Sequence, residues 1–170
     1  MIYNAIDIAR YVINFSNKNG KSITNLKLQK LLYYIQAGFL VEIGHCCFND
    51  EILCWQHGPV VKNVYDSYKQ FKDHVIPEQK DFSKITIKDG KLVIAKEIYD
   101  ESNYDECDKK LINKIILGLI NYDPWELVDR THEESPWYDL QEFNEIITRE
   151  SIKKYFMLPR NRDRIYGKFN

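Results

Sequence analysis

Hydrophobic residues recur at helical spacing near the start of the chain. Ile8, Val12 and Phe15 fall on one face of a helix, because side chains three and four positions apart are neighbours on a helix surface. Asn4 stands just before this stretch, where its side chain can cap the first backbone N–H groups. Asn19-Gly20 follows it, and either residue tolerates the left-handed conformation that ends many helices. The pattern predicts a first helix that starts at Asn4.

A wider apolar stripe follows between Thr24 and Gly44. Its hydrophobic residues are Leu28, Leu31, Leu32, Ile35, Phe39, Leu40 and Ile43. Thr24 or Asn25 is a suitable N-cap, and Gly44 is a suitable stop. Because so wide a stripe needs neighbours on more than one side, the sequence predicts a central helix that other elements enclose.

Alternating apolar and polar residues predict two β elements. Residues 50–56 indicate a short strand, after which His57-Gly58 turns the chain. We expect Pro59 in the first turn of the next helix, where its missing N–H is no loss. Residues 85–94 predict a hairpin, since Asp89-Gly90 readily takes the positive φ angles of a type I′ turn. A lone hairpin is marginally stable, so we expect it to pack on the helices or to pair with the strand at 50–56.

Helical patterns dominate the second half of the chain. Residues 111–119 form a strongly apolar helical stretch. Asp123-Pro124 and Ser135-Pro136 each combine a capping residue with a proline that suits the first helical turn. Thr148 can cap a last helix, which must end before Pro159.

These patterns together predict a single compact α+β domain, mainly α-helical, with a central apolar helix and a small antiparallel β element. The chain has 170 residues, of which 44% are hydrophobic and 14% aromatic, and this suits one packed core. We expect the domain to span residues 1–158. Residues 159–170 are rich in arginine and are expected to form a loosely held, basic C-terminal tail.

The charge of the chain gives little reason to expect a nucleic-acid partner. The net charge is −1; residues 1–96 carry 13 Lys and Arg against 9 Asp and Glu, whereas residues 97–170 carry 11 against 16. Phosphate contacts need a clustered positive face. The basic tail and the pair Lys27 and Lys30 support one only weakly, so direct nucleic-acid binding is not favoured.

The cysteines and the apolar runs favour a reduced, cytoplasmic protein. Cys46, Cys47, Cys54 and Cys107 do not form the pattern of a disulfide framework in a chain of this length. The first residues lead straight into an amphipathic pattern without a signal peptide. No apolar run approaches the ~20 residues that a membrane-spanning helix needs, so no membrane partner is expected.

One cluster has the residue types of a zinc site. His45-Cys46-Cys47 is followed about ten residues later by Cys54 and His57, and thiolate and imidazole groups suit Zn²⁺. Structural zinc sites usually pair ligands two to four residues apart at both ends, whereas the first pair here is adjacent. The spacing disfavours zinc without deciding whether these residues bind a metal. No glycine-rich phosphate loop occurs either, so no cofactor is predicted.

A second group has residue types found in hydrolases. His132-Glu133 resembles the start of an H-E-x-x-H metalloprotease helix, but Pro136 stands where the second His is required. A Cys–His pair made by Cys54 with His57 or His132 lacks any supporting flanking signature. A small cytoplasmic hydrolase using His132 with Glu133 or Cys54 stays open as an alternative function.

Three blocks of the sequence form one ordered pattern: a Leu-Lys-Leu-Gln-Lys-Leu helix, a tryptophan strand running into Gly-Pro-Val, and Thr-His-Glu-Glu before Pro-Trp. The first block is Leu26 to Leu31, and the family-motif positions singled out in the three blocks are Leu28, Gln29, Lys30, Leu31, Trp55, Gly58, Pro59, Val60, Thr131, His132, Glu133, Glu134, Pro136 and Trp137. In this order the blocks resemble the Panacea antitoxin domain family, which includes SocA-like antitoxins and GepA-like proteins of phage and mobile elements. The resemblance extends over roughly residues 2–155.

The resemblance implies a protein that binds rather than catalyses. It implies an antitoxin that neutralises a cognate protein toxin by direct contact, either by occlusion or as an adaptor that presents the toxin to a protease. On this view the family residues are structural or partner-binding, and none is catalytic, cofactor-binding or metal-binding. A phage-derived regulatory adaptor without a toxin is a further alternative.

The individual roles expected for these residues differ. Trp55 is expected in the core, and Gly58 is expected to serve backbone geometry. His132 stands at a predicted helix end, where it can bind exposed carbonyl groups, and this structural role is favoured. The alternative places His132, Glu133 and Glu134 together on a polar surface that faces the partner.

Overall fold

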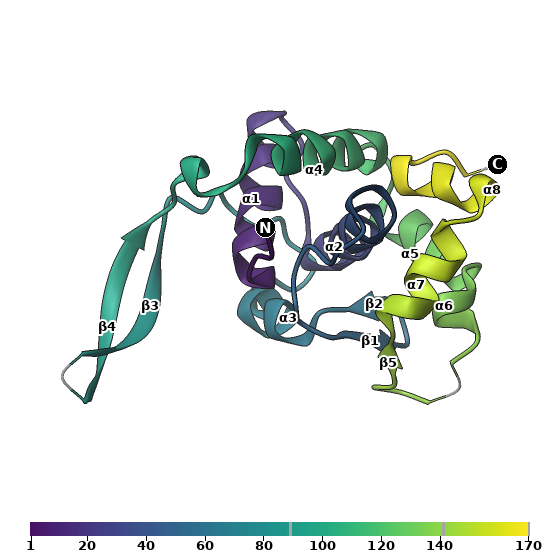
Figure 1. Cartoon of the computed structure of the whole chain (residues 1–170). Coiled ribbons are helices and arrows are strands. Elements are labelled where there is room, and N and C mark those ends of the chain that lie inside the picture. Colours follow the sequence, from purple (N-terminus) through teal and green to yellow (C-terminus); the bar gives the residue numbers. More distant parts are fainter. Residues whose placement is uncertain (89, 141, 170) are drawn as a thin grey trace.

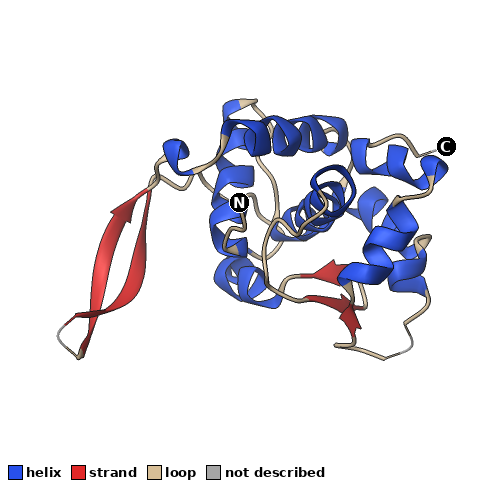
Figure 2. Ribbon diagram, viewed as in Figure 1, coloured by secondary structure: helices blue, strands red, loops and turns tan. Residues whose placement is uncertain are grey.

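The structure, a computed structural model, describes residues 1–88, 90–140 and 142–169. It consists of a helical body and a β-hairpin that projects from it (Figures 1 and 2). The helices are α1 (Ala5–Lys18), α2 (Asn25–Gly38), α3 (Lys62–Tyr68), α4 (Glu106–Leu119), α5 (Pro124–His132), α6 (Ser135–Tyr138), α7 (Arg149–Phe156) and α8 (Pro159–Arg162). The strands are β1 (Ile52–Trp55), β2 (Gly58–Val60), β3 (Asp81–Lys88), β4 (Lys91–Ile98) and β5 (Ile146–Ile147). The prediction of a mainly helical α+β fold is confirmed.

Helix α2 is the central helix that the wide apolar stripe predicts. Every residue from 27 to 38 is buried. Helices α1, α3, α4, α5 and α7 pack against it together with β2, and Figure 1 shows these elements arranged around it. The helix continues into one π-helical turn, Phe39–Ile43, and stops at Gly44, whose φ of 91° is left-handed. A helix in this position supplies side chains to the core on all of its sides.

Capping side chains fix the helix starts where the sequence predicts them. Asn4 accepts a hydrogen bond from the backbone N–H of Ile6 at the start of α1. Thr24 caps α2 in the same way, and Thr148 caps α7. At α5 the side chains of Asp123 and Glu126 form a reciprocal capping box, which satisfies two of the free N–H groups at that end.

A small antiparallel sheet lies beside the helices in the order β2-β1-β5. The chain turns tightly at Gly58, whose φ is 94°, and Trp55 pairs with Gly58 in the sheet. Pro59 pairs with Cys54 in this sheet, so its expected place in a helix is wrong. The edge position of β2 tolerates a proline, because the missing N–H costs no internal hydrogen bond there. The next helix starts at Lys62 instead.

The hairpin β3–β4 forms a separate two-stranded sheet, which we call the arm. Its pairing runs from Asp81 opposite Ile98 to Lys88 opposite Lys91, and so extends the predicted hairpin at both ends. The expectation that it would pack on the helices or pair with β1 is wrong: among the described residues the arm pairs with no other strand, and it points away from the body (Figure 1). Asp89 of the predicted turn lies outside the described residues.

Contacts at the base of the arm hold it to the body. The guanidinium carbon of Arg10 lies 3.5 Å from the centre of the Phe82 ring. Just before the arm, the Asn14 side chain accepts a hydrogen bond from the backbone of Gln79 and donates one back to it, at 2.7 and 3.0 Å. The arm is therefore attached at its base, and the stability of its outer part depends on the contacts between its own two strands.

The segment 159–169 is packed on the body, and the expectation of a loosely held tail is wrong. Helix α8 leads into a 3-10 turn, Asp163–Tyr166, that packs against α4. Ile165 is completely buried, and the Tyr122 hydroxyl donates a hydrogen bond of 2.6 Å to the carbonyl of Gly167. The expectation was wrong because it rested on the basic composition of the segment and overlooked Ile165, which packs into the core. Where the family domain ends along the chain stays a prediction. No helix among the described residues is long and apolar enough to cross a membrane.

We expect Gly118→Ala to lower stability although alanine favours helices. A Cβ on Gly118, in α4, would lie 2.4 Å from the backbone oxygen of Tyr166. The usual gain of about 1 kcal/mol for Ala over Gly in a helix is then outweighed by overpacking, and we expect a net loss of roughly 1–3 kcal/mol in urea unfolding. The control Leu117→Ala alters the exposed neighbour and changes stability little. An unchanged or raised stability of Gly118→Ala would contradict the packing of residues 163–167 on α4.

Candidate functional site

The first two sequence blocks meet where α2 passes the β1–β2 turn. The Gln29 side chain accepts a hydrogen bond of 2.9 Å from the backbone N–H of Val61. Its Nε2 donates to Oδ1 of Asn25 at 2.9 Å, and Asn25 in turn donates to the carbonyl of Tyr65 at 3.1 Å. This chain of amides joins α2, the residue after β2, and α3; the two bonds of Gln29 are buried and the bond from Asn25 to Tyr65 is partly buried. Gln29 thus positions the polypeptide that follows Gly-Pro-Val.

Lys30 lies next to it, with none of its surface exposed. Its Nζ donates to the carbonyl oxygen of Pro59 at 3.1 Å. Burial lowers the pKa of Lys30 to about 7, because the charged ammonium loses its hydration. A Cβ on Gly58 would lie 2.7 Å from both Lys30 Nζ and Thr131 Oγ1. Only glycine therefore fits between these two side chains, in addition to allowing the left-handed φ.

The third block contributes a buried ion pair. Glu134 is fully buried, and its Oε1 accepts hydrogen bonds from Arg164 Nε at 2.8 Å and from the Tyr34 hydroxyl at 2.9 Å. Burial raises the pKa of the Glu134 carboxyl to about 7, and the guanidinium beside it opposes this rise. Glu134 therefore cannot lie on a partner-facing surface, as one alternative expected. Glu133 is exposed, and its carboxylate lies 3.2 Å from Arg164 and 3.5 Å from Arg130.

His132 packs against an aromatic ring rather than facing solvent freely. Its ring stacks on Trp137 with centroids 3.8 Å apart and planes 12° apart. Trp137 Nε1 donates to the carbonyl of Trp55 at 3.0 Å, which ties the third block to β1. Burial lowers the pKa of His132, and its Nε2 has no hydrogen-bond partner among the described residues. These contacts give His132 a packing role between the blocks.

Trp55 is half-buried, and its expected place in the core is wrong. Its ring meets Tyr65 edge-on at 4.9 Å and lies 5.4 Å from Phe143. Its Nε1 donates to Oδ1 of Asn144 at 2.6 Å. Trp55 is the last residue of β1 and lies at the edge of the small sheet. Its indole ring is therefore partly packed against other side chains and partly exposed to solvent.

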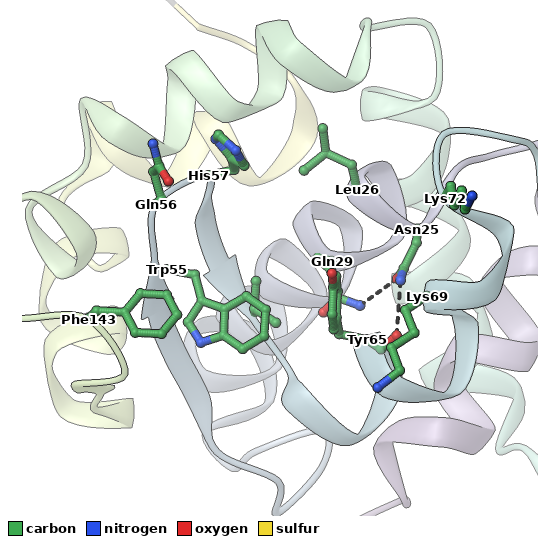
Figure 3. Close-up of a pocket in the computed structure, with 11 residues that line it drawn as sticks. Asn25, Leu26, Gln29, Trp55, Gln56, His57, Tyr65, Lys69, Lys72 and Phe143 are labelled. Atoms are coloured by element: carbon green, nitrogen blue, oxygen red, sulfur yellow. Dashed lines mark hydrogen bonds between the residues drawn. The ribbon is translucent and has the colours of Figure 1, made fainter.

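A cavity of about 270 Å³ opens beside Trp55 (Figure 3). Trp55, Tyr65 and Phe143 supply aromatic walls, and the amides of Asn25 and Gln29 lie at its inner side. The full lining is Asn25, Leu26, Gln29, Trp55, Gln56, His57, Val60, Tyr65, Lys69, Lys72 and Phe143. Since the inner amides are already bonded to each other and to backbone, the cavity offers an occupant mainly apolar surface.

Two lysines stand at the mouth of this cavity. Lys69 and Lys72 are exposed, and Lys69 also contacts the carboxylate of Asp66 at 2.9 Å. Lys72 has a positive φ of 54°, which is uncommon for a residue with a Cβ. The sequence blocks contain four lining residues, Leu26, Gln29, Trp55 and Val60. Tyr65, Lys69 and Phe143 were missed. The 12 tyrosines of the chain are a signal that could have pointed toward such a surface, because tyrosine is enriched at interfaces.

The hydrolase residues are not brought into one catalytic arrangement. The Glu133 carboxylate binds arginines, and no hydrogen bond joins His132 to Glu133 or Cys54 within the described part of the chain. Burial raises the pKa of the Cys54 thiol, which is opposite to what an activated nucleophile needs. Across residues 1–88, 90–140 and 142–169, no cluster of three or more His, Cys, Asp or Glu side chains could hold a metal ion.

A preformed apolar cavity on a rigid helical scaffold is typical of a protein that binds another macromolecule or a small ligand. A family model described as antitoxin SocA-like, Panacea domain, matches residues 28–138. The chain therefore belongs to the Panacea domain family of SocA-like antitoxins, which confirms the resemblance of the three blocks. Neither a curated protein nor a solved structure matches the chain.

The buried amine of Lys30 predicts a specific pH dependence of stability. Between its folded pKa of about 7 and the unfolded value of 10.5, the unfolded chain holds a proton that the folded protein does not. Stability therefore rises with pH across this window, by about 1 kcal/mol per pH unit. We expect urea unfolding at pH 7, 8 and 9 to show this rise relative to Lys30→Met, which lacks the titrating group. An exposed control, Lys21→Met, should keep the wild-type slope; equal slopes for wild type and Lys30→Met would contradict the assignment.

Proposed function

We propose that this protein is an antitoxin that binds a cognate protein toxin directly and that the cavity beside Trp55 receives a side chain of the toxin. The single observation that supports this most is that family residues Gln29, Trp55 and Val60 line an open cavity. Most other family residues make contacts inside the protein. Apart from the exposed Glu133, whose carboxylate binds arginines, the cavity is where the described family residues reach the surface.

The lining defines the chemistry of the occupant. Aromatic walls favour an aromatic or large aliphatic side chain, since such anchors contribute most of the energy at protein interfaces. Lys69 and Lys72 at the mouth favour acidic residues beside that anchor. A volume of about 270 Å³ is at the lower end of the range for small-molecule pockets and is large enough for one or two side chains of a protein.

We further propose that the complex forms in the cytoplasm and that neutralisation acts either by occluding the toxin or by presenting it to a protease. The structure weakens the support for nucleic-acid binding that came from Lys27 and Lys30. Lys30 is fully buried, and the Lys27 amine donates to the carbonyls of Ile120 and Tyr122 at 2.5 and 2.6 Å. Neither lysine is free to meet phosphate.

The experiment that tests the function uses the neighbouring gene. Expressed alone, its product should reduce the number of viable cells, and co-expression of this chain should restore it. Rescue supports the antitoxin function and supplies the partner. A harmless neighbour favours the regulatory adaptor without a toxin, and toxicity without rescue contradicts neutralisation by this chain.

We expect Trp55→Ala to separate binding from folding. Because Trp55 is half-buried, its loss should cost roughly 1–2 kcal/mol of stability, less than the 3–5 kcal/mol typical of a core tryptophan. Its loss as an anchor should weaken toxin binding by about 2 kcal/mol or more, roughly 30-fold. Calorimetric titration with the purified toxin measures the binding change, and thermal unfolding measures the stability change.

The matched control is Tyr138→Ala, which removes an aromatic side chain that is 68% exposed and does not line the cavity. It should leave the affinity unchanged. If both variants bind the toxin like wild type, the toxin binds elsewhere on the surface, even if rescue in cells succeeds.

A further inference from the structure

One face of the arm carries four large aliphatic side chains that the body does not cover. Ile85 lies opposite Ile94 and Ile87 opposite Leu92, so all four point to the same side of the two-stranded sheet. Their exposed fractions are 69% and 73% for the first pair and 75% and 77% for the second. We call this surface the aliphatic face. Four such neighbours form a contiguous patch, which marks an interaction site more often than scattered single residues do.

The aliphatic face has a clear limit toward the body. We call each pair of directly opposite residues a rung. On the same side of the sheet, the next pair toward the body is Ser83 opposite Lys96, and the pair that follows it on that side is Asp81 opposite Ile98. Lys96 and Asp81 form an ion pair of 3.0 Å across the strands. The opposite side of the outer arm differs, with Thr86 opposite Val93 and Lys88 opposite Lys91. The arm is therefore amphipathic, with its apolar side confined to the outer rungs.

A hairpin of two strands gains little stability from its own contacts. Without a partner, this one leaves its most apolar side in water at a distance from the core (Figure 1). Covering that face would remove apolar surface from water and would stabilise the hairpin at the same time. The surface that covers it must be apolar, narrow and able to approach a projecting arm.

We propose that the aliphatic face binds the aliphatic face of a second copy of this chain, with the two arms antiparallel. A twofold axis beside the rung Thr86–Val93 places the four aliphatic residues of one copy on the same four residues of the other. A patch that is centred on such an axis is complementary to itself, as a twofold interface requires. The base of each arm, at the pair Asp81–Ile98, then lies five residue pairs from the axis, which is roughly 17 Å along the strand. The bases of the two arms, and with them the two bodies, are therefore roughly 30 Å apart and do not collide.

The positions of the two bodies favour this antiparallel order. A parallel pair would place both bodies at the same end of the paired arms, whereas the antiparallel pair places them at opposite ends. Charge does not decide between the two orders. Lys88 and Lys91 at the tip and Glu97 near the base lie on the side of each arm that faces away from the aliphatic face, so the two paired sheets, about 10 Å apart, separate these charges.

The size of the contact sets its strength. Two aliphatic faces bury roughly 1,000 Å² in total, which is at the low end of specific protein interfaces. We therefore expect a reversible dimer with a dissociation constant of roughly 1–100 µM. Such a dimer does not depend on the cavity beside Trp55, so it stands or fails separately from the antitoxin function.

Sedimentation velocity of the full chain over this concentration range tests the proposal. Wild type should shift from monomer to dimer as concentration rises. Ile94→Lys, which places a charge in the aliphatic face, should raise the dissociation constant at least 30-fold. The control Val93→Lys adds the same charge at the adjacent position on the opposite side of β4 and should dimerise nearly as wild type does.

Backbone amide NMR signals show whether the arm is still paired in each variant. If the strands are no longer paired in Ile94→Lys, the variant Leu92→Thr is used in its place and should likewise weaken the dimer. Threonine keeps the preference for a strand while removing apolar surface from the aliphatic face. Wild type that stays monomeric to about 100 µM overturns the proposal. Equal loss of dimer in Ile94→Lys and Val93→Lys also overturns it. A wild-type monomer whose toxin binding is lost only in Ile94→Lys would instead assign the face to the toxin.

Discussion

The polar side chains on the buried surface of α2 are the constraint on which the rest of the structure depends. An unpaired polar group in the interior costs about 1–3 kcal/mol, so each of these side chains needs a partner at one defined place. The Lys27 amine reaches two carbonyls that follow α4. The Gln36 side chain accepts a hydrogen bond from the N–H of Cys47 at 2.8 Å and donates to the carbonyl of Phe48 at 3.0 Å. Together with Gln29 and Lys30, these groups fix the neighbouring segments in register around one helix.

This constraint explains why sequence blocks far apart along the chain work as one unit. The Leu-Lys-Leu-Gln-Lys-Leu block supplies buried donors and acceptors. The Gly-Pro-Val block supplies the carbonyl that Lys30 binds, and Val61, directly after that block, supplies the N–H that Gln29 binds. Thr131 and Glu134 close the same region from the other side. Residues engaged in this way are not available to a partner. In the proposed function, recognition falls to side chains at the margin, such as Trp55 and the lysines near it, and in the proposed dimer to the arm.

Much of the fold could be predicted from the sequence because local rules decide it. Caps at Asn4, Thr24, Asp123 and Thr148 and the stop at Gly44 depend on neighbouring residues only. The errors concern what lies far away in sequence. Pro59 fits a helix start and an edge strand equally well by local criteria, and only its pairing with β1 decides between them. The sequence left open a polar, partner-facing patch at His132, Glu133 and Glu134 as the less favoured alternative, and only the distant Arg164 beside Glu134 removes Glu134 from it. The cavity could not be predicted, since Tyr65 and Phe143 meet Trp55 only after folding.

The pairing of Glu134 with Arg164 has a consequence for the order of events during synthesis. The ribosome must translate past residue 164, and that residue must leave the exit tunnel, before the buried carboxylate gains its guanidinium. Until then the nascent chain holds an acidic group in a site that only the later segment completes. If the proposed antitoxin function holds, neutralisation requires the last part of the packed chain and does not grow with chain length. A premature stop codon shortly before Arg164, or proteolytic removal of this segment, would leave a product that keeps the whole family pattern and yet cannot close its core.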